Sequence, residues 1–264
     1  MTQASDPFSR YIERHTQGRQ LVIPDIHGCA LTFEALLEVI DLQLQDQLFL
    51  LGDYIDRGPD SGRVLLKIQQ LIHDGYQVYP LRGNHEQYLL DAYEYYDAAA
   101  FKRFLEMNEC IGVADENGSL LPPHQKFLEN LPYFYETDSF FLVHAGFNWA
   151  HATHGWVNTS DRAVPYKSRQ PFQDYGSMLE IRDFRATFGQ TGNKRVVHGH
   201  QVTNLRDIEM SIEQGSTVIP LDNGCCFAKM GAEYMRVGNV IMGNLCCLNL
   251  DTLQLTVQPN VDYL

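Results

Sequence analysis

The stretch QLVIPDIHGCALTFEALLEVI, residues 20–40, decides the fold of this chain. Its apolar run at 20–23 ends in Pro24, and a short polar turn then leads into a segment with helical spacing over 31–40. A buried strand followed by an amphipathic helix has this pattern. Because proline disfavours helix in the residue before it, the apolar run is expected to stay extended up to the turn.

The same alternation occurs twice more in the first third of the chain. QLFLL, residues 47–51, precedes a helical pattern at 61–74, and a short run at 76–81 precedes a helix expected to start near Glu86. This βαβαβ order predicts a parallel sheet with right-handed crossovers. The loops that leave the three strands would then open on one edge of the sheet, where α/β proteins place their ligands.

The rest of the chain predicts more helices and further strands. Residues 87–130 have helical spacing and many aromatic and acidic side chains, for which we expect mainly packing roles. The polar and aromatic stretch 147–176 is expected to be a long loop. Further strands are expected at 140–144, 194–198, 217–221 and 246–257, the last with the alternation of a half-buried strand.

The simplest domain organisation is one α/β domain over residues 1–264 with a mixed or second sheet. We find no internal repeat, low-complexity tract or linker in the sequence. Within this domain we distinguish an N-terminal lead, at about 1–18, and a helical, cap-like insertion at 87–135. The oligomeric state stays open.

Composition and charge narrow the class of protein. The chain is 44% hydrophobic and has a formal net charge of −13. Nucleic acids and anionic membranes are therefore not expected as partners, because phosphate backbones require fields of lysine and arginine. A phosphorylated substrate stays compatible, since bound metal cations can invert the local field. The N-terminus shows no secretory signal and no apolar run could span a membrane, so a cytoplasmic location is expected.

The cysteines are expected to be reduced, buried thiols. Adjacent cysteines rarely form a disulfide with each other, and none of these six follows a C-x-x-C pattern. A redox pairing between the two adjacent pairs is the alternative. The six are Cys29, Cys110, Cys225, Cys226, Cys246 and Cys247.

Residues with metal-binding or phosphate-binding side chains follow five of the expected strands. They are Asp25 and His27; Asp53, Asp56 and Arg57; Arg82, Asn84, His85 and Glu86; His144; and His198 and His200. Each group alone also fits a turn, a surface salt bridge or a satisfied core histidine. Five such groups at what we expect to be one sheet edge indicate a shared site, because buried charge is costly unless it is paired or metal-bound.

The residue types limit the metal. Aspartate, asparagine and histidine without cysteine suit Mn, Fe, Zn or Mg rather than copper–thiolate or iron–sulfur chemistry. The residues suffice for two ions, which in such sites lie about 3.5–4 Å apart and clamp both oxygens of an in-line displacement. Asp53, in the middle of the order, is the natural bridge between them. Neighbouring arginines offer planar forks for phosphate oxygens.

At these residues the sequence resembles the phosphoprotein phosphatase (PPP) family of calcineurin-like metallophosphoesterases, in particular its small bacterial and phage-type serine/threonine phosphatases. The resemblance spans residues 21–224 and implies a sandwich of two mixed sheets flanked by helices, in α/β/β/α order. The matching motifs are PDIHG (24–28), GDYIDRG (52–58), GNHE (83–86), HAG (144–146) and GHQ (199–201).

The resemblance implies a dinuclear metal centre. The matching ligands are Asp25, His27 and Asp53 for the first metal, and Asp53, Asn84, His144 and His200 for the second. His85 matches the general acid that protonates the leaving oxygen, oriented by Asp56. A metal-activated water would attack phosphorus in line, without a covalent enzyme intermediate. Mn²⁺ is the expected metal at both positions, with Fe, Zn and Mg²⁺ as alternatives.

The resemblance also implies residues that bind the substrate phosphate. Arg57 and Arg82 match the phosphate-binding arginines of their motifs, and Asn84 is expected beside them. A further family arginine lies in a looser region, where Arg182 is the best match and Arg185 the second. A helix-surface charge is the alternative for both.

Three positions depart from the family's motifs without removing a proposed ligand. Pro24 replaces a glycine, Gln201 replaces a threonine, and Asn223 follows an aspartate where relatives often show Asp-Thr-Gly. In the loop after HAG, His151 and His154 are candidates for substrate contact, with surface or packing roles as the alternative.

The first functional prediction is a serine/threonine protein phosphatase, a phosphomonoesterase that acts on phosphoproteins or small phosphoesters. The alternative is a symmetrical diadenosine tetraphosphate hydrolase, which shares the DxHG and GNH core. The complete GDYIDRG and the glutamate of GNHE favour the phosphatase, since that hydrolase group typically departs from DRG and has GNHD. A catalytically silent metal-binding scaffold would be expected to lack the acid or a ligand, whereas here the set is complete.

Overall fold

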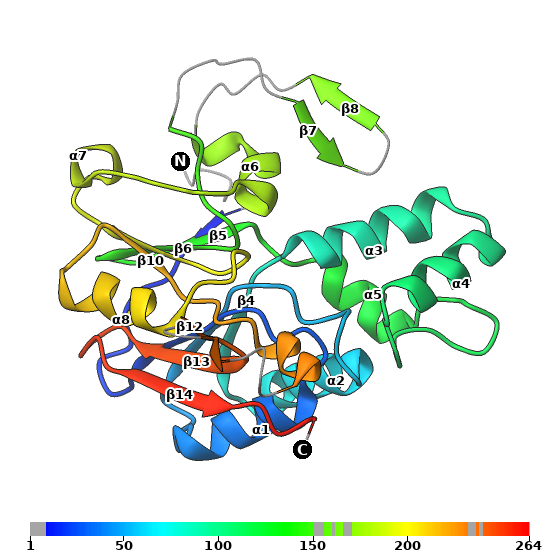
Figure 1. Ribbon diagram of the computed structural model, residues 1–264, viewed down its shortest axis with the longest axis horizontal. Coiled ribbons are helices and arrows are strands. Elements are labelled where there is room, and N and C mark those ends of the chain that lie inside the picture. Colours follow the sequence, from blue (N-terminus) through cyan, green and yellow to red (C-terminus); the bar gives the residue numbers. More distant parts are fainter. Residues whose placement is uncertain are drawn as a thin grey trace, which may run out of the picture.

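The fold is a sandwich of two five-stranded sheets with helices on its outer sides (Figure 1). The computed structural model describes residues 9–149, 156–159, 162–165, 171–231, 236–237 and 240–263. At 156–159, 162–165 and 236–237 only the backbone is described. The predicted α/β/β/α architecture is confirmed.

The first sheet joins the N-terminal strands to a C-terminal hairpin, in the order β14-β13-β2-β3-β4. Strands β2, β3 and β4 are parallel, and β13 and β14 are added antiparallel. The helices α1 (Ala30–Val39) and α2 (Ser61–His73) connect the parallel strands, which confirms the predicted βαβαβ unit. The strands are β2 Gln20–Ile23, β3 Gln47–Leu50, β4 Gln77–Pro80, β13 Asn244–Asn249 and β14 Leu255–Pro259.

The second sheet has the order β1-β5-β6-β9-β10. All its neighbouring strands are parallel except β5 and β6, which are antiparallel. The predicted strands at 140–144, 194–198 and 217–221 appear here as β6, β9 and β10. The strands are β1 Ser9–Tyr11, β5 Phe134–Glu136, β6 Phe140–Val143, β9 Arg195–His198 and β10 Val218–Pro220.

Alternation along the strands divides the core into layers. Val22 and Phe49 of the first sheet pack in one cluster with Leu142 and Val197 of the second, which fills the space between the sheets. Leu21, the neighbour of Val22, belongs to a different cluster that includes the buried faces of α1 and α2. Strands buried on both faces explain why their sequences are continuous apolar runs.

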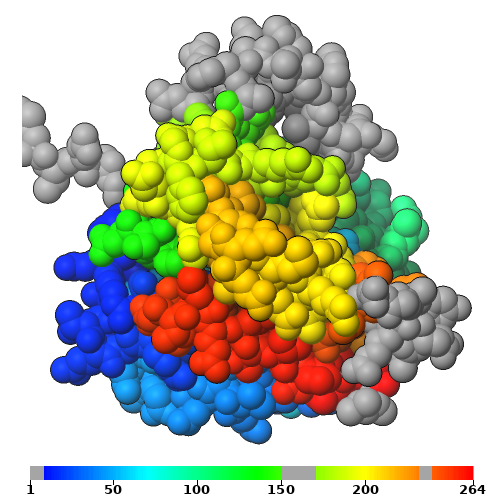
Figure 2. Space-filling view, turned by 60° about the vertical axis from the view of Figure 1, so that its left-hand side comes forward, coloured from blue at the N-terminus to red at the C-terminus, as the bar shows by residue number. Residues whose placement is uncertain are grey.

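Three helices extend from the end of β4 and form a group beside the sandwich, on the right in Figure 1: α3 Asn84–Tyr95, α4 Ala98–Met107 and α5 Pro122–Glu129. They confirm the helical prediction for 87–130. The second sheet is accompanied by α6 Tyr175–Glu180, α7 Phe188–Thr191 and α8 Leu205–Glu213. In Figure 2 the yellow α8 segment lies beside the red C-terminal strands, and Ile208 packs in the same cluster as Leu248.

Two predictions about elements differ from the structure. The single strand expected at 246–257 is two strands, β13 and β14, joined by a turn between Asn249 and Gln254. The apolar positions change phase at this turn, from Leu248 and Leu250 to Leu253 and Leu255. The long loop expected at 147–176 contains a two-stranded hairpin and two short helical segments. These are β7 Trp156–Thr159, β8 Arg162–Pro165, η1 Pro171–Gln173 and α6.

The remaining elements are the 3-10 segment η2 Cys225–Met230 and the short strands β11 Arg236–Val237 and β12 Val240–Ile241. All six cysteines are free and buried, as expected. Among the residues that the structure describes, no helix is both long and apolar enough to cross a bilayer.

Candidate metal centre

The candidate site lies where loops leave the carboxyl ends of strands in both sheets. Strands β2, β3 and β4 lead into Asp25, Asp53 and Asn84, while β6 and β9 lead into His144 and His200. The expectation of one sheet edge was wrong, because these strands belong to two sheets. Strand direction can be inferred from a βαβ pattern, whereas sheet membership depends on long-range pairing. The packing of the sheets nevertheless brings the two edges together.

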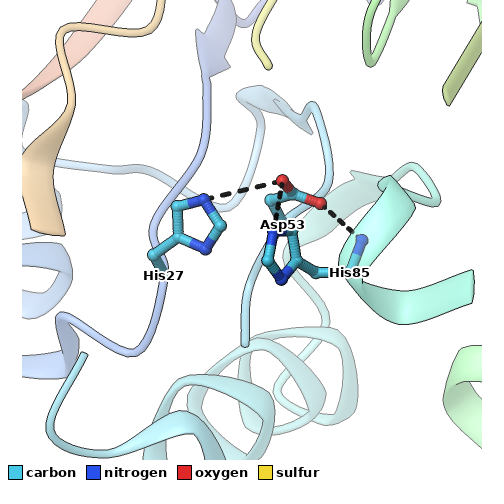
Figure 3. Close-up of side chains that lie close together, drawn as sticks. All are labelled: His27, Asp53 and His85. Atoms are coloured by element: carbon cyan, nitrogen blue, oxygen red, sulfur yellow. Dashed lines mark hydrogen bonds and ion pairs between the residues drawn. The ribbon is translucent and has the colours of Figure 1, made fainter. Parts of the chain in front are cut away.

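Asp53 lies at the centre of the site (Figure 3). Its Oδ2 atom is 3.5 Å from Nε2 of His27 and 3.5 Å from Nε2 of His144. Its Oδ1 atom accepts a hydrogen bond from the backbone N–H of His85 at 3.0 Å. Two groups with ligand atoms within 4.8 Å of one another share this carboxylate: His27, Asp53 and His85, and Asp53, His144 and His200.

His144 and Asn84 face each other with two acceptor atoms. Nδ1 of His144 lies 2.9 Å from the carbonyl oxygen of Leu51, which can only accept, so Nδ1 carries the proton. Nε2 is then unprotonated, and it lies 2.9 Å from Oδ1 of Asn84. Two lone pairs that converge in this way repel each other, and a cation bound to both would remove that repulsion.

His200 adds a second acceptor to the same position. Its Nδ1 lies 3.2 Å from Oδ1 of Asn84, and its buried Nε2 has no hydrogen-bond partner among the described residues. A buried polar atom without a partner costs about 1–3 kcal/mol, which binding to a metal would offset. The backbone N–H of His200 also donates to both oxygens of Asp25, at 2.9 and 3.0 Å.

Arg57 lies against the ligand atom of His27. Nδ1 of His27 donates to the carbonyl oxygen of Ile55 at 2.9 Å, which leaves Nε2 as an acceptor. Nη1 of Arg57 donates to this Nε2 at 2.8 Å, and Nη2 lies 2.8 Å from Nε2 of His85. A cation bound by His27 would therefore compete with the guanidinium for the same lone pair.

His85 differs from His27 and His144 in the hydrogen-bond partner of its Nδ1 atom. Its Nδ1 lies 2.6 Å from Oδ2 of Asp56, which fixes the proton on that nitrogen. Burial alone would lower the pKa of His85, but the charge of Asp53 and the hydrogen bond to Asp56 outweigh burial and raise the pKa above its usual value. Such a histidine can hold a proton for a leaving oxygen.

The other histidines of the site are neutral. Burial lowers the pKa of His27 and His144, and it lowers that of His200 to about 3. The neutral imidazole is the form that binds metals. Burial would raise the pKa of Asp53, but the surrounding histidines, led by His144, lower it. The site thus offers a carboxylate and several unprotonated nitrogens.

Asp222 is a buried carboxylate that the sequence analysis did not assign to the site. Burial raises its pKa to about 6, and the charge of Asp53 adds to this shift. Burial raises the pKa of Asp25 well above its usual value, and Asp222 is the next largest cause. The signal was available, because Asp222 directly follows the predicted strand 217–221.

Glu86 holds the loop of Asp53 in place. Its carboxylate accepts hydrogen bonds from the backbone N–H groups of Asp53 at 2.8 Å, Tyr54 at 2.8 Å and Gly83 at 2.9 Å. Partners of this kind orient the groups that bind a metal. Glu86 is the last residue of the GNHE motif, whose sequence alone does not reveal this role.

The guanidinium of Arg82 is bound by α5 and α3. Its Nη2 donates to the backbone carbonyls of Leu128 and Glu129 at 3.0 and 2.8 Å, which caps the C-terminus of α5. Its Nη1 donates to Gln87 at 2.7 Å. The described contacts thus link Arg57 to the histidines and Arg82 to α3 and α5, and the role of Arg82 in phosphate binding stays a prediction.

Arg182 is exposed and lies close to the second group. Its charge is one of the causes that lower the pKa of His200, after burial and His144. Arg185 is exposed as well. His151 and His154, the candidates for substrate contact, lie outside the described residues.

The backbone of the site is strained. Non-glycine residues with positive φ are uncommon and cost about 1–3 kcal/mol each, so they persist where the surroundings enforce them, often at functional sites. Such residues cluster here: His27 (φ 48°), Asp53 (52°), Asp56 (69°), Arg57 (65°) and His200 (65°).

The donor set fits two divalent cations. Carboxylate, amide oxygen and neutral imidazole without thiolate suit Mn, Fe, Zn or Mg. The residues that would hold them are the predicted ligands Asp25, His27 and Asp53 on one side and Asp53, Asn84, His144 and His200 on the other, with His85 adjoining the first group.

Comparisons with known proteins find similarity to phosphatases and phosphoesterases. Over 73 residues the chain is 41% identical to the symmetrical bis(5'-nucleosyl)-tetraphosphatase of Wigglesworthia glossinidia brevipalpis. That match covers 27% of this chain and 26% of the relative, so the chain matches only about a quarter of the relative's length.

Solved structures share the whole fold. A protein described as a candidate diadenosine tetraphosphatase superposes with a TM-score of 0.58 at 19% identity, covering 96% of this chain and 97% of that one. A protein serine/threonine phosphatase from Saccharomyces cerevisiae gives a TM-score of 0.58 at 14% identity, covering 97% and 84%.

The family is shown by sequence. The profile of the calcineurin-like phosphoesterases matches residues 18–209, a span that contains the groups around Asp53 and both strand-end histidines of the second sheet. This chain therefore belongs to the calcineurin-like phosphoesterase family.

Proposed function

We propose that this protein is a metal-dependent phosphoesterase whose substrates are symmetrical dinucleoside tetraphosphates. The observation that carries the phosphoesterase proposal is the Asp53 carboxylate shared by two groups of histidines. In this proposal residues 1–264 form one catalytic domain, with 87–135 as a helical, cap-like insertion.

The side chains of the site have separate tasks in this proposal. Two bound divalent cations would supply Lewis acidity and an activated water for attack on phosphorus. His85 keeps one proton on Nδ1 toward Asp56 and, in its doubly protonated form, donates the other from Nε2 to the leaving oxygen. Arg57 is released from Nε2 of His27 and offers its planar fork to phosphate oxygens. Arg182 extends the positive side of the site.

The substrate class rests on the relatives. The first prediction from sequence was a protein phosphatase, but the relative reported above, at 41% identity over 73 residues, bears the name of a symmetrical bis(5'-nucleosyl)-tetraphosphatase. This name favours the hydrolase that the sequence analysis kept as its alternative.

A serine/threonine protein phosphatase is the second candidate. The complete GDYIDRG and GNHE motifs favour it, because they supply the Asp56–His85 pair and the Glu86 clamp together. Both candidates use the same metal centre, so they differ in what surrounds the scissile bond rather than in the chemistry.

A side-by-side assay tests the proposal. Metal-stripped protein is reconstituted with Mn²⁺, Mg²⁺, Zn²⁺ or Fe²⁺ and assayed on diadenosine tetraphosphate, a phosphoserine peptide and an aryl phosphate. We expect the highest kcat/KM for the dinucleotide, with symmetric cleavage to two diphosphates. A higher value for the phosphopeptide would favour the second candidate. No turnover with any metal would refute the phosphoesterase proposal.

A further inference from the structure

Tyr88 lies one helical turn after Asn84, a candidate ligand of the second metal position. It lies four residues after Asn84 on α3, so the two side chains share one face of the helix, and the Tyr88 side chain leans back over Asn84. The Tyr88 ring is 5.9 Å from the ring of His85. Tyr88 is half-buried, and the roles assigned above do not use it.

Glu180 connects Tyr88 to the second sheet's helices. The Tyr88 hydroxyl donates a hydrogen bond to Oε1 of Glu180, the last residue of α6. A carboxylate can only accept, so the phenolic proton points toward Glu180. The phenol oxygen can then only accept from its other side.

The Asn84 amide can be oriented in two ways, and only one leaves an oxygen for a metal. Oδ1 lies 2.9 Å from Nε2 of His144 and 3.2 Å from Nδ1 of His200. The NH₂ group then faces away from these histidines, and the Asn84 side chain is a hydrogen-bond partner of Tyr88. A phenol that donated to Asn84 instead would favour the flipped amide, with NH₂ toward the histidines.

We propose that Tyr88 and Glu180 are positioning residues that hold the Asn84 amide with its oxygen toward the second metal position. Glu180 directs the proton of Tyr88, and Tyr88 accepts from the amide NH₂. Outer partners of metal ligands typically contribute 10–100-fold to metal affinity. The inference rests on the proposed function only in so far as both require a metal beside Asn84.

Metal titration tests the proposal without any substrate. Metal-free parent, Y88F, E180A and E180Q are titrated with Mn²⁺ and followed by bound metal and by Mn²⁺ EPR. Y93F is the matched control, because it removes a hydroxyl from the same helix where the ring packs on Phe101, 5.2 Å away. Thermal unfolding of each variant records any general loss of structure.

We expect Y88F and E180A to bind one Mn²⁺ like the parent and the second about 10–100-fold more weakly. E180Q keeps an acceptor for the phenol and should retain the parent's affinity at both positions, as should Y93F. Equal affinities in Y88F and Y93F would overturn the proposal, as would equal weakening at both positions. An E180Q variant as weak as E180A would overturn it too, because charge rather than hydrogen-bond direction would then matter.

The outcome is separable from that of the proposed function. If Y88F binds one Mn²⁺ more weakly than the parent, and the parent hydrolyses no phosphoester, the positioning role is sustained and the phosphoesterase proposal is refuted. If the parent hydrolyses the dinucleotide and Y88F binds two ions as tightly as the parent, the phosphoesterase proposal is sustained and the positioning role is refuted.

Discussion

At the scale of single residues, the histidines of the site are of two kinds. His27 and His144 donate from Nδ1 to a backbone carbonyl, and burial lowers their pKa. His85 faces a carboxylate, and its pKa is raised. The partner of Nδ1 therefore separates nitrogens suited to a metal from one suited to proton transfer.

The variant His85→Asn tests this separation. It removes the proton donor, and turnover is expected to fall about 10²–10⁴-fold while both metals stay bound. Asp56→Asn should lower turnover in the same direction, because it removes the carboxylate that orients the imidazole. Steady-state kinetics and metal analysis measure both effects. An unchanged kcat in the histidine variant would refute its role as the acid.

Gly199 is a second residue on which the site depends. A Cβ at this position would lie 2.0 Å from Oδ1 of Asp25. Gly199→Ala is therefore expected to displace Asp25 and to destabilise the fold by about 1–3 kcal/mol. Chemical denaturation and Mn²⁺ binding measure the two effects. Gly189→Ala is the control, since its Cβ would meet only the Thr187 side chain, at 4.0 Å; equal behaviour of the two variants would contradict the account.

At the scale of elements, the periodicity of the sequence predicts the βαβαβ unit well. The runs at 20–23 and 47–51 are buried on both faces, so they appear as continuous apolar segments. The failure at 246–257 has a different origin. The apolar positions change from Leu248 and Leu250 to Leu253 and Leu255, and this change of phase marks a turn that the single-strand prediction overlooked. The helix expected near Glu86 begins at Asn84.

The Asp46 side chain links the connection between α1 and β3 to the residue that precedes β2 by hydrogen bonds. It is 2% exposed and accepts from the backbone N–H of Arg19 at 2.9 Å and of Gln43 at 3.0 Å. Burial would raise its pKa, but the hydrogen bonds from Arg19 and Gln43 and the charge of Arg19 outweigh burial and lower it. A lowered folded-state pKa means that this stabilisation is complete above the unfolded pKa, about 3.9, and is lost as pH falls through the folded value.

Asp46→Asn is accordingly expected to lower the free energy of unfolding by about 1–3 kcal/mol at pH 7. The difference between parent and variant should shrink below about pH 4, where the carboxylate becomes protonated first in the unfolded chain and then, at lower pH, in the folded one. Urea denaturation at several pH values measures it. Asp74→Asn, at an exposed carboxylate after α2, is the control. A difference that grows on acidification would contradict the assignment.

At the scale of the whole molecule, sequence patterns predicted the groups that lie together in the structure, but not the way the two sheets combine them. The ends of β2, β3 and β4 meet the ends of β6 and β9 only through packing of one sheet on the other. The capping of α5 by Arg82, the pairing of Tyr88 with Glu180 and the closeness of Asp222 to Asp25 are likewise long-range contacts. Motif spacing contains no information on such contacts.

The central claim is that Asp53 joins two metal positions that phosphoester hydrolysis requires. The most direct measurement titrates metal-free parent and Asp53→Asn with Mn²⁺ and records bound metal and diadenosine tetraphosphate hydrolysis in the same samples. The parent is predicted to bind two ions per chain and to gain activity as they bind. The variant is predicted to lose at least one ion and its turnover. A variant with two tightly bound ions and full activity would contradict the account.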